Sequence, residues 1–186
     1  MDSINKRTDL SGEWICKLDN EDVGIMQKWY LKLLDGQRIK LPGTLAENGI
    51  GNRYEREEGL TKENVRCLRS KFQYIGAAWY QKEIVLEEAV CLSELKLFFE
   101  RVMFQSMVWI NEIYIGSNDS LSAPHIFEPV IEDKKLKKSR ITICIDNRDL
   151  QKIGNYSSAY TDETQTIWNG IIGSMYLCKK EVFKIG

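Results

Sequence analysis

The chain has 186 residues, of which 43% are hydrophobic, 28% charged and 10% aromatic, as is typical of one globular domain and not of a disordered chain. Its 26 Lys and Arg residues nearly balance 27 Asp and Glu residues, so there is no basic field to hold nucleic acid. No apolar run reaches the roughly 18 residues of a transmembrane helix. We therefore expect one domain over residues 1–186, with no nucleic acid and no membrane as partner.

Short apolar runs between turn signals predict an all-β sandwich, since long helical patterns are absent. In chain order, the predicted strands are Glu13–Leu18, Trp79–Leu86, Leu92–Glu100, Ser106–Ile110, Ile113–Gly116, Ile126–Ile131, Ile141–Ile145 and Met175–Cys178. The clearest is Ile141–Ile145, because its alternating isoleucines share one face of a pleated strand. Thr61–Leu68 is predicted as a short helix that Thr61 caps, although Asn64 stands where a capping box needs Glu or Gln.

Ser106–Ile110 and Ile113–Gly116 form a predicted hairpin whose turn is Asn111-Glu112. Asn tolerates the positive φ of a tight turn, whereas Glu is less suited than Gly to the second position. The basic run Lys134–Arg140 follows two acidic residues. It is interpreted as a solvated turn and not as a nucleic-acid site.

The five cysteines, Cys16, Cys67, Cys91, Cys144 and Cys178, lie far apart in the sequence. They form no CxxC pair for zinc, and their odd number excludes a complete disulfide framework within one chain. Several are expected to be small buried residues on strands. We expect no metal site and no cofactor, since metal-ligand spacing and phosphate-binding glycine loops are also absent.

Candidate catalytic groups are few. His125 is the only histidine and no GxSxG motif accompanies it, so we expect it to make a structural hydrogen bond where a strand begins. The doublets Glu57-Glu58 and Glu87-Glu88 are poor candidates for a glycosidase pair, because neighbours on a strand point to opposite faces. They are interpreted as solvated loop residues, and no catalytic residue is assigned.

The tryptophans are more informative than the acids. Trp14 and Trp109 fall inside strand patterns and are expected in the core. Trp168 instead lies among Thr, Gln, Asn and Gly residues in the segment Thr164–Gly173. Amides that bond hydroxyl groups and an aromatic face that covers a sugar ring are the usual means of holding carbohydrate. Trp168 is therefore either part of a sugar site or a plug at the end of the sandwich.

Several motifs occur together in a fixed order. They are Leu10-Ser-Gly-Glu-Trp14, Leu41-Pro-Gly-Thr44, Tyr74-Ile-Gly-Ala-Ala-Trp-Tyr80, Phe99-Glu-Arg-Val102, Val108-Trp-Ile-Asn111, Gly116, Asp119-Ser-Leu-Ser-Ala-Pro-His125, Asp146-Asn147 and Thr164-Gln-Thr-Ile-Trp-Asn-Gly-Ile-Ile-Gly173. As a set they resemble the N-terminal sugar-binding domain of the β-galactosidase/β-glucuronidase family, glycoside hydrolase family two. The resemblance covers residues 10–178.

This resemblance implies a jelly-roll β-sandwich like the galactose-binding domains. In the family it precedes an immunoglobulin-like sandwich and a TIM barrel that holds both catalytic glutamates. A chain of 186 residues has no room for such a barrel, which needs about 250. The chain is therefore expected to be a non-catalytic part of a retaining, β-galactosidase-like enzyme, in contact with those two domains.

In the family, the loop before the W-x-G-I motif helps to line the sugar pocket. Carried over, this implies Thr164, Gln165, Trp168 and Asn169 as carbohydrate-binding residues. Ser157–Tyr160 stands where relatives commonly carry His, and Asn111-Glu112 replaces the usual Asn-Gly. The first departure removes a titratable group near the expected sugar.

Three functions remain open at this point: an accessory domain that contacts the sugar of its parent enzyme, a free-standing lectin-like module, and a purely structural domain. Some family members form oligomers through this region, so a homo-oligomer is a further expectation. The N-terminal residues MDSINKRTDL contain no apolar core of a signal peptide. A periplasmic or secreted parent follows from family habit alone.

Overall fold

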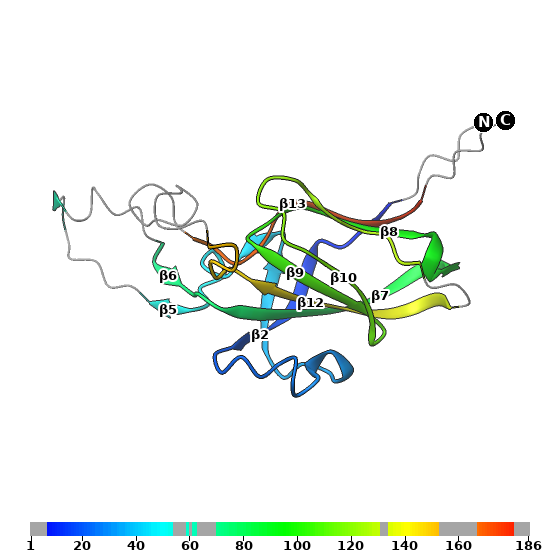
Figure 1. The fold of residues 1–186 in the computed structure, drawn as a ribbon, viewed down its shortest axis with the longest axis horizontal. Helices are drawn as coiled ribbons and strands as arrows, with labels where there is room; N and C mark the ends of the chain where they lie inside the picture. The colour runs from blue at the N-terminus through cyan, green and yellow to red at the C-terminus, as the bar shows by residue number, and fades with distance from the viewer. Residues whose placement is uncertain are drawn as a thin grey trace.

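The domain is an antiparallel β-sandwich. The structure, a computed structural model, describes residues 7–53, 59, 61–62, 70–130, 134–152 and 167–180. Figure 1 shows β8 and β13 along one side of the molecule and β2, β7 and β12 along the other. Every strand pairing among the described residues is antiparallel, which confirms the predicted fold class.

The smaller layer is a five-stranded sheet in the order β1-β13-β8-β11, with β4 also paired to β13. Its strands are β1 (Thr8–Asp9), β4 (Gly43–Thr44), β8 (Leu95–Val102), β11 (His125–Phe127) and β13 (Gly170–Lys179). The larger layer is a six-stranded sheet in the order β10-β9-β12-β7-β2-β3. Its strands are β2 (Gly12–Asp19), β3 (Gln37–Leu41), β7 (Ala77–Cys91), β9 (Gln105–Ile110), β10 (Ile113–Asn118) and β12 (Lys135–Asp146). A separate two-stranded sheet joins β5 (Asn52–Arg53) to β6 (Phe72–Gln73).

Apolar side chains from the facing surfaces of the two large sheets form the main core. Alternate residues of β12, Ile141, Ile143 and Ile145, all belong to it, as their period of two predicts. Trp14 and Phe99 are among its largest fully buried side chains. Burying aromatic and branched side chains is the main stabilising contribution in a domain of this kind.

A second, smaller core lies on the other face of the six-stranded sheet. Because strand residues alternate, Ala78 and Tyr80 enter the main core while Trp79 points the opposite way into a cluster with Trp29 and Trp109. Residues 20–36, which include the 3-10 helix η1 (Trp29–Leu31), cover this cluster, and Figure 1 shows them outside the sheet. Trp79 and Trp109 stack with their ring centroids 5.3 Å apart.

The predicted strands are all present, with changed boundaries. β8 begins at Leu95 because a 3-10 helix, η2 (Leu92–Glu94), precedes it. β11 ends at Phe127, two residues before Pro129, which has no N–H to donate to a neighbouring strand. Asn111 and Glu112 both have positive φ, 47° and 72°, and thus form the predicted hairpin turn between β9 and β10.

The interpretation of Lys134–Arg140 as a turn is wrong. Six of its seven residues belong to β12, because Leu136 and Ser139 point inward while the lysines extend into solvent. An irregularity between Leu136 and Lys138 shifts the register and places Lys137 and Lys138 both at the surface. Some of these basic side chains form ion pairs, such as that of Lys138 Nζ with a carboxylate oxygen of Glu83 at 3.5 Å.

Two further predictions have mixed outcomes. Glu87 and Glu88 are exposed as expected, but they lie on β7 and not in a loop. The predicted helix Thr61–Leu68 lies outside the described residues, apart from its first two positions.

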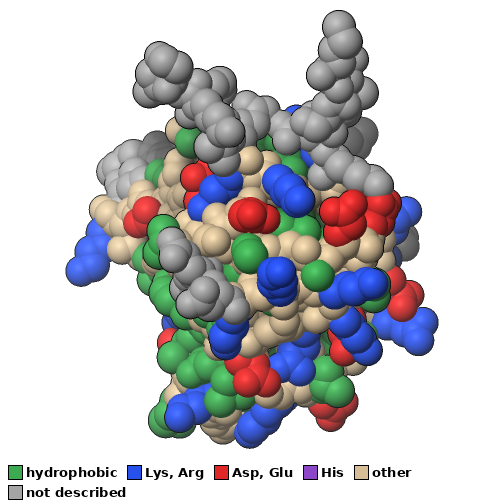
Figure 2. All heavy atoms as spheres, turned by 90° about the vertical axis from the view of Figure 1, so that its right-hand side faces the viewer, with side chains coloured by type: hydrophobic (Ala, Val, Ile, Leu, Met, Phe, Trp, Pro, Cys, Tyr) green, Lys and Arg blue, Asp and Glu red, His purple; other side chains and the backbone are tan. Residues whose placement is uncertain are grey.

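Figure 2 shows acidic and basic side chains interspersed over one face of the molecule. Among the described residues, no helix has the length and apolar character needed to cross a membrane.

Candidate functional site

The Trp168 segment lies where β12, β13 and the residues before β7 meet. Asn147 follows β12 directly, and its amide nitrogen donates to the carbonyl oxygens of Tyr74 at 2.8 Å and of Trp168 at 3.1 Å. The amide oxygen of the same side chain accepts the backbone N–H of Gly76 at 2.9 Å. Asn147 is 1% exposed. One buried side chain thus holds three chain segments together at this end of the sandwich.

Asn169 makes a second buried set of bonds next to it. Its amide nitrogen donates to the carbonyl oxygens of Gly76 and Ile145, both at 3.1 Å, and its oxygen accepts the Tyr80 hydroxyl at 2.6 Å. Both N–H donors of Asn169 are therefore used inside the domain, and the residue is 2% exposed. The structure places the Asn169 side chain inside the domain, directly after Trp168 in the chain. Burial raises the pKa of Tyr80 well above its ordinary value, so its hydroxyl stays protonated.

Trp168 itself is half-buried and lines a cleft of about 340 Å³. The other residues at this cleft are Thr44, Ala46, Glu47, Ser70, Lys71 and Ile172. Thr44 and Glu47 hold part of the wall in a reciprocal turn, in which Glu47 accepts the backbone N–H of Thr44 at 2.8 Å and donates its own N–H to the Thr44 hydroxyl at 3.1 Å. The cleft therefore combines an aromatic face with hydroxyl, carboxylate and ammonium groups.

Gly170 closes the motif for a steric reason. It pairs with Thr44 across the β13–β4 ladder and has a φ of +141°. A Cβ atom at this position would lie 2.3 Å from the carbonyl oxygen of Gly43. Only glycine allows these two strands to approach so closely, and this approach brings Trp168 next to the Thr44–Glu47 turn.

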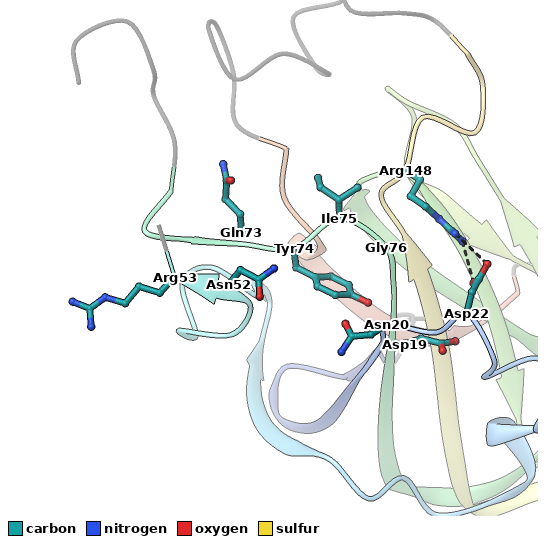
Figure 3. A pocket seen from close by; sticks show the side chains of 10 residues that line it. All are labelled: Asp19, Asn20, Asp22, Asn52, Arg53, Gln73, Tyr74, Ile75, Gly76 and Arg148. Atoms are coloured by element: carbon teal, nitrogen blue, oxygen red, sulfur yellow. Dashed lines mark hydrogen bonds and ion pairs between the residues drawn. The ribbon is translucent and has the colours of Figure 1, made fainter. Parts of the chain in front are cut away.

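A polar pocket of about 410 Å³ lies near this end of the sandwich, and we call it the Asn52 pocket (Figure 3). It is lined by Asp19, Asn20, Asp22, Asn52, Arg53, Gln73, Tyr74, Ile75, Gly76 and Arg148. Arg148 donates to Asp22 through two nitrogens at 3.1 Å and also pairs with the buried Asp146. Such a doubly bonded guanidinium is a rigid part of the wall. Burial raises the pKa of Tyr74 to about 12, and its hydroxyl donates to the carbonyl oxygen of Ala77.

His125 has the structural role that we predicted for it. It is fully buried at the first position of β11, where Nε2 lies 3.0 Å from the carbonyl oxygen of Ser120 and Nδ1 lies 2.6 Å from Ser106 Oγ. Because a carbonyl only accepts, Nε2 carries the proton and Ser106 donates to Nδ1. The Ser–His pair resembles a nucleophile with its base, but neither residue is exposed, so no substrate can reach it.

Only some of the remaining residues that we considered from the sequence belong to the described part of the chain. Thr164, Gln165 and the doublet Glu57-Glu58 lie outside the described residues. Cys16, Cys144 and Cys178 are buried on strands, as expected, and burial raises the pKa of the Cys16 thiol to about 12. Within the described ranges, no group of His, Cys, Asp and Glu side chains is arranged to hold a metal ion.

Asn147 and the amides of the Asn52 pocket were not singled out from the sequence. Asn147 was part of the Asp146-Asn147 motif, but nothing local shows that its side chain is buried. Its partners at Gly76 and Tyr74 are 71 and 73 residues away. Its place two residues after the clearest apolar strand, Ile141–Ile145, was the one available signal.

The structure defines the chain as an antiparallel β-sandwich domain with a cleft beside Trp168 at one end. Residues 7–181 match the family of glycosyl hydrolases family 2, sugar binding domain. The match spans nearly the whole chain, and the chain belongs to this family.

Solved structures with this fold include β-glucuronidases. A β-glucuronidase from Ruminococcus gnavus is 14% identical with a TM-score of 0.67, covering 96% of this chain and 29% of that one. A β-glucuronidase from an uncultured Clostridium sp. is 16% identical with a TM-score of 0.61, covering 96% of this chain and 30% of that one. At this identity the likeness concerns the fold. The chain spans less than a third of the length of these proteins.

Proposed function

We propose that this chain is the accessory sugar-binding domain of a β-glycosidase, and that the cleft beside Trp168 forms one wall of the sugar pocket of that enzyme. Catalysis is assigned to a TIM barrel that follows an immunoglobulin-like sandwich, both beyond this chain. The family assignment supports a glycosidase as the parent protein. Thr164 and Gln165 are proposed to contact the sugar together with Trp168, while Asn169 supports the position of the indole from below.

The observation that carries the proposal is the way the Trp168 backbone is held. Asn147 fixes its carbonyl oxygen, and its N–H points to Met103 Sδ at 3.4 Å. The next residue, Asn169, is anchored by its own side-chain bonds to Gly76 and Ile145. Trp168 nevertheless remains only partly buried and lines a cleft with polar groups. An aromatic face that is rigid and accessible costs little entropy to bind a ring, which favours a ligand contact over a plug.

The test is a pair of substitutions in the complete enzyme. Trp168→Ala is expected to lower kcat/KM for a nitrophenyl β-glycoside about tenfold, the equivalent of one lost stacking contact. Trp168→Phe should restore part of this loss. Tyr114→Ala serves as the matched control, because Tyr114 is a half-exposed aromatic residue that packs on Trp109 at the other sheet face. If Trp168→Ala changes thermal stability and leaves kcat/KM unchanged, the domain is purely structural.

The proposal leaves two substrate classes for the parent enzyme, β-galactosides and β-glucuronides. The family resemblance favours a β-galactosidase-like parent, whereas the similar solved structures are named β-glucuronidases. Hydrolysis of nitrophenyl β-galactoside and nitrophenyl β-glucuronide by the complete enzyme separates the two. We expect the isolated chain to hydrolyse neither, and turnover by the pure chain would contradict the accessory role. A free-standing lectin is not favoured, because the matching family is a domain of glycosyl hydrolases.

A further inference from the structure

Three residues with amide side chains line the Asn52 pocket. Asn20 and Asn52 lie on either side of Tyr74, whereas Figure 3 shows Gln73 pointing away from them. Asn20 follows β2, Asn52 begins β5 and Gln73 ends β6. Asn20 and Asn52 are exposed and Gln73 is half-buried. Among the described residues, none of the three amide groups makes a hydrogen bond. Each amide offers both donors and an acceptor, which is the combination that pairs of sugar hydroxyls require.

The rest of the pocket wall is rigid and partly apolar. Tyr74 is fixed by its hydroxyl bond to Ala77 and by the bond of its carbonyl oxygen to Asn147. Ile75 is 56% exposed next to it. Figure 3 shows Tyr74 between the loop that carries Asn20 and the strand that carries Asn52. A volume of about 410 Å³ lies within the range of small-molecule sites, so one sugar unit fits.

The charges exclude two other kinds of ligand. Both oxygens of Asp19 accept backbone N–H groups of residues 23 and 24, and one also accepts the Trp79 indole N–H. Both oxygens of Asp22 are paired with Arg148. Since these carboxylates are already satisfied, they offer no ligand set for a cation.

An anion is also disfavoured. The guanidinium of Arg148 is shared between two carboxylates, and the third carboxylate, Asp19, lies in the same wall. Figure 3 shows Arg53 pointing away from the other labelled side chains. The interior of the pocket therefore carries excess negative charge, which repels a carboxylate, sulfate or phosphate group.

We propose that the Asn52 pocket binds a neutral glycosyl unit through Asn20 and Asn52, and that it discriminates against uronic acids. This site is separate from the cleft beside Trp168, and the proposal does not depend on the role of Trp168. It adds a second carbohydrate contact to the domain, with a charge preference of its own.

The test is a titration of the chain, labelled with ¹⁵N, with matched methyl glycosides. Methyl β-glucopyranoside and methyl β-galactopyranoside are the neutral probes, and methyl β-glucuronide differs from the first only by a carboxylate at C6. We expect saturable shifts of the side-chain amide signals of Asn20 and Asn52 with at least one neutral probe. The uronide should bind at least about threefold more weakly, because it adds a like charge.

Substitutions locate the binding. Asn20→Ala and Asn52→Ala should each weaken the neutral probe about fivefold, the effect of one lost hydrogen bond, and both positions are exposed, so the fold is preserved. Gln37→Ala, which removes an exposed amide at the start of β3, and Trp168→Ala should leave this binding unchanged. No saturable shift with either neutral probe, binding unaffected by both Asn substitutions, or tighter binding of the uronide would each overturn the proposal. A lower kcat/KM of the Trp168→Ala enzyme would not bear on the proposal for the Asn52 pocket.

Discussion

At the scale of single residues, His125 shows how burial determines protonation. Desolvation lowers the pKa of its imidazole below the ordinary 6.5 and outweighs the opposing effects of the Ser120 carbonyl and Asp119. The folded domain therefore holds the neutral ring, bonded to Ser106 and Ser120. The unfolded chain binds a proton at about pH 6.5, where the folded domain does not.

The sign of the pH dependence follows from this difference. Above about pH 6.5 both states are neutral at His125, and below it the unfolded state gains a proton first, so acid lowers the free energy of unfolding. His125→Gln removes this contribution. We expect the destabilisation caused by His125→Gln, measured by urea unfolding, to be smaller at about pH 5.5 than at about pH 7.5. A destabilisation that grows toward acid pH would mean that the folded domain holds the protonated ring.

At the scale of elements, the β9–β10 hairpin contains an avoidable strain. Glu112 adopts a φ of 72° in the turn, a left-handed conformation that favours glycine. Its carboxylate also contacts Arg140 Nη2 at 3.4 Å, so removal of the side chain has a cost as well. The two effects are separable, because alanine loses the ion pair and retains the strain.

We therefore expect Glu112→Gly to be more stable than Glu112→Ala by about 1 kcal/mol. Both variants lose the contact with Arg140, and only glycine relieves the backbone. Chemical denaturation of the two variants and of the original chain gives the comparison. Equal stability of the two variants would show that this turn carries no strain at Glu112.

At the scale of the whole molecule, Asn169 connects the two sheets. It directly precedes β13 of the smaller sheet and bonds Tyr80 and Ile145 of the larger one. Asn169→Ala leaves a buried hydroxyl and two buried carbonyl groups without this partner. We expect a loss of about 2–4 kcal/mol in the free energy of unfolding.

Asn52→Ala is the matched control for that measurement. Asn52 is an exposed asparagine, so its replacement should change stability by less than about 0.5 kcal/mol. If Asn169→Ala is as stable as the control, the buried amide is not the joint between the sheets, and its role as a support for Trp168 loses its basis.

Local patterns in the sequence were enough to predict the strands, the hairpin turn and the structural hydrogen bond of His125, and the family followed from the resemblance of the ordered motifs. Alternation of apolar residues is visible within a few positions, and it correctly placed the isoleucines of β12 in the core. The same reasoning failed for Lys134–Arg140, because a run of lysines hides the alternation that Leu136 and Ser139 continue. The predicted sugar contacts at Thr164 and Gln165 remain predictions.

Only the tertiary structure decided which polar side chains face inward and which face a pocket. Asn147 and Asn169 reach partners 71 to 93 residues away, so their burial depends on how the two sheets meet. The amides of the Asn52 pocket likewise come from distant segments, since Asn20 follows β2 and Asn52 lies on β5. Sequence patterns report which face of its own strand a residue occupies, whereas a site is made by faces of different elements, and their approach is determined by packing.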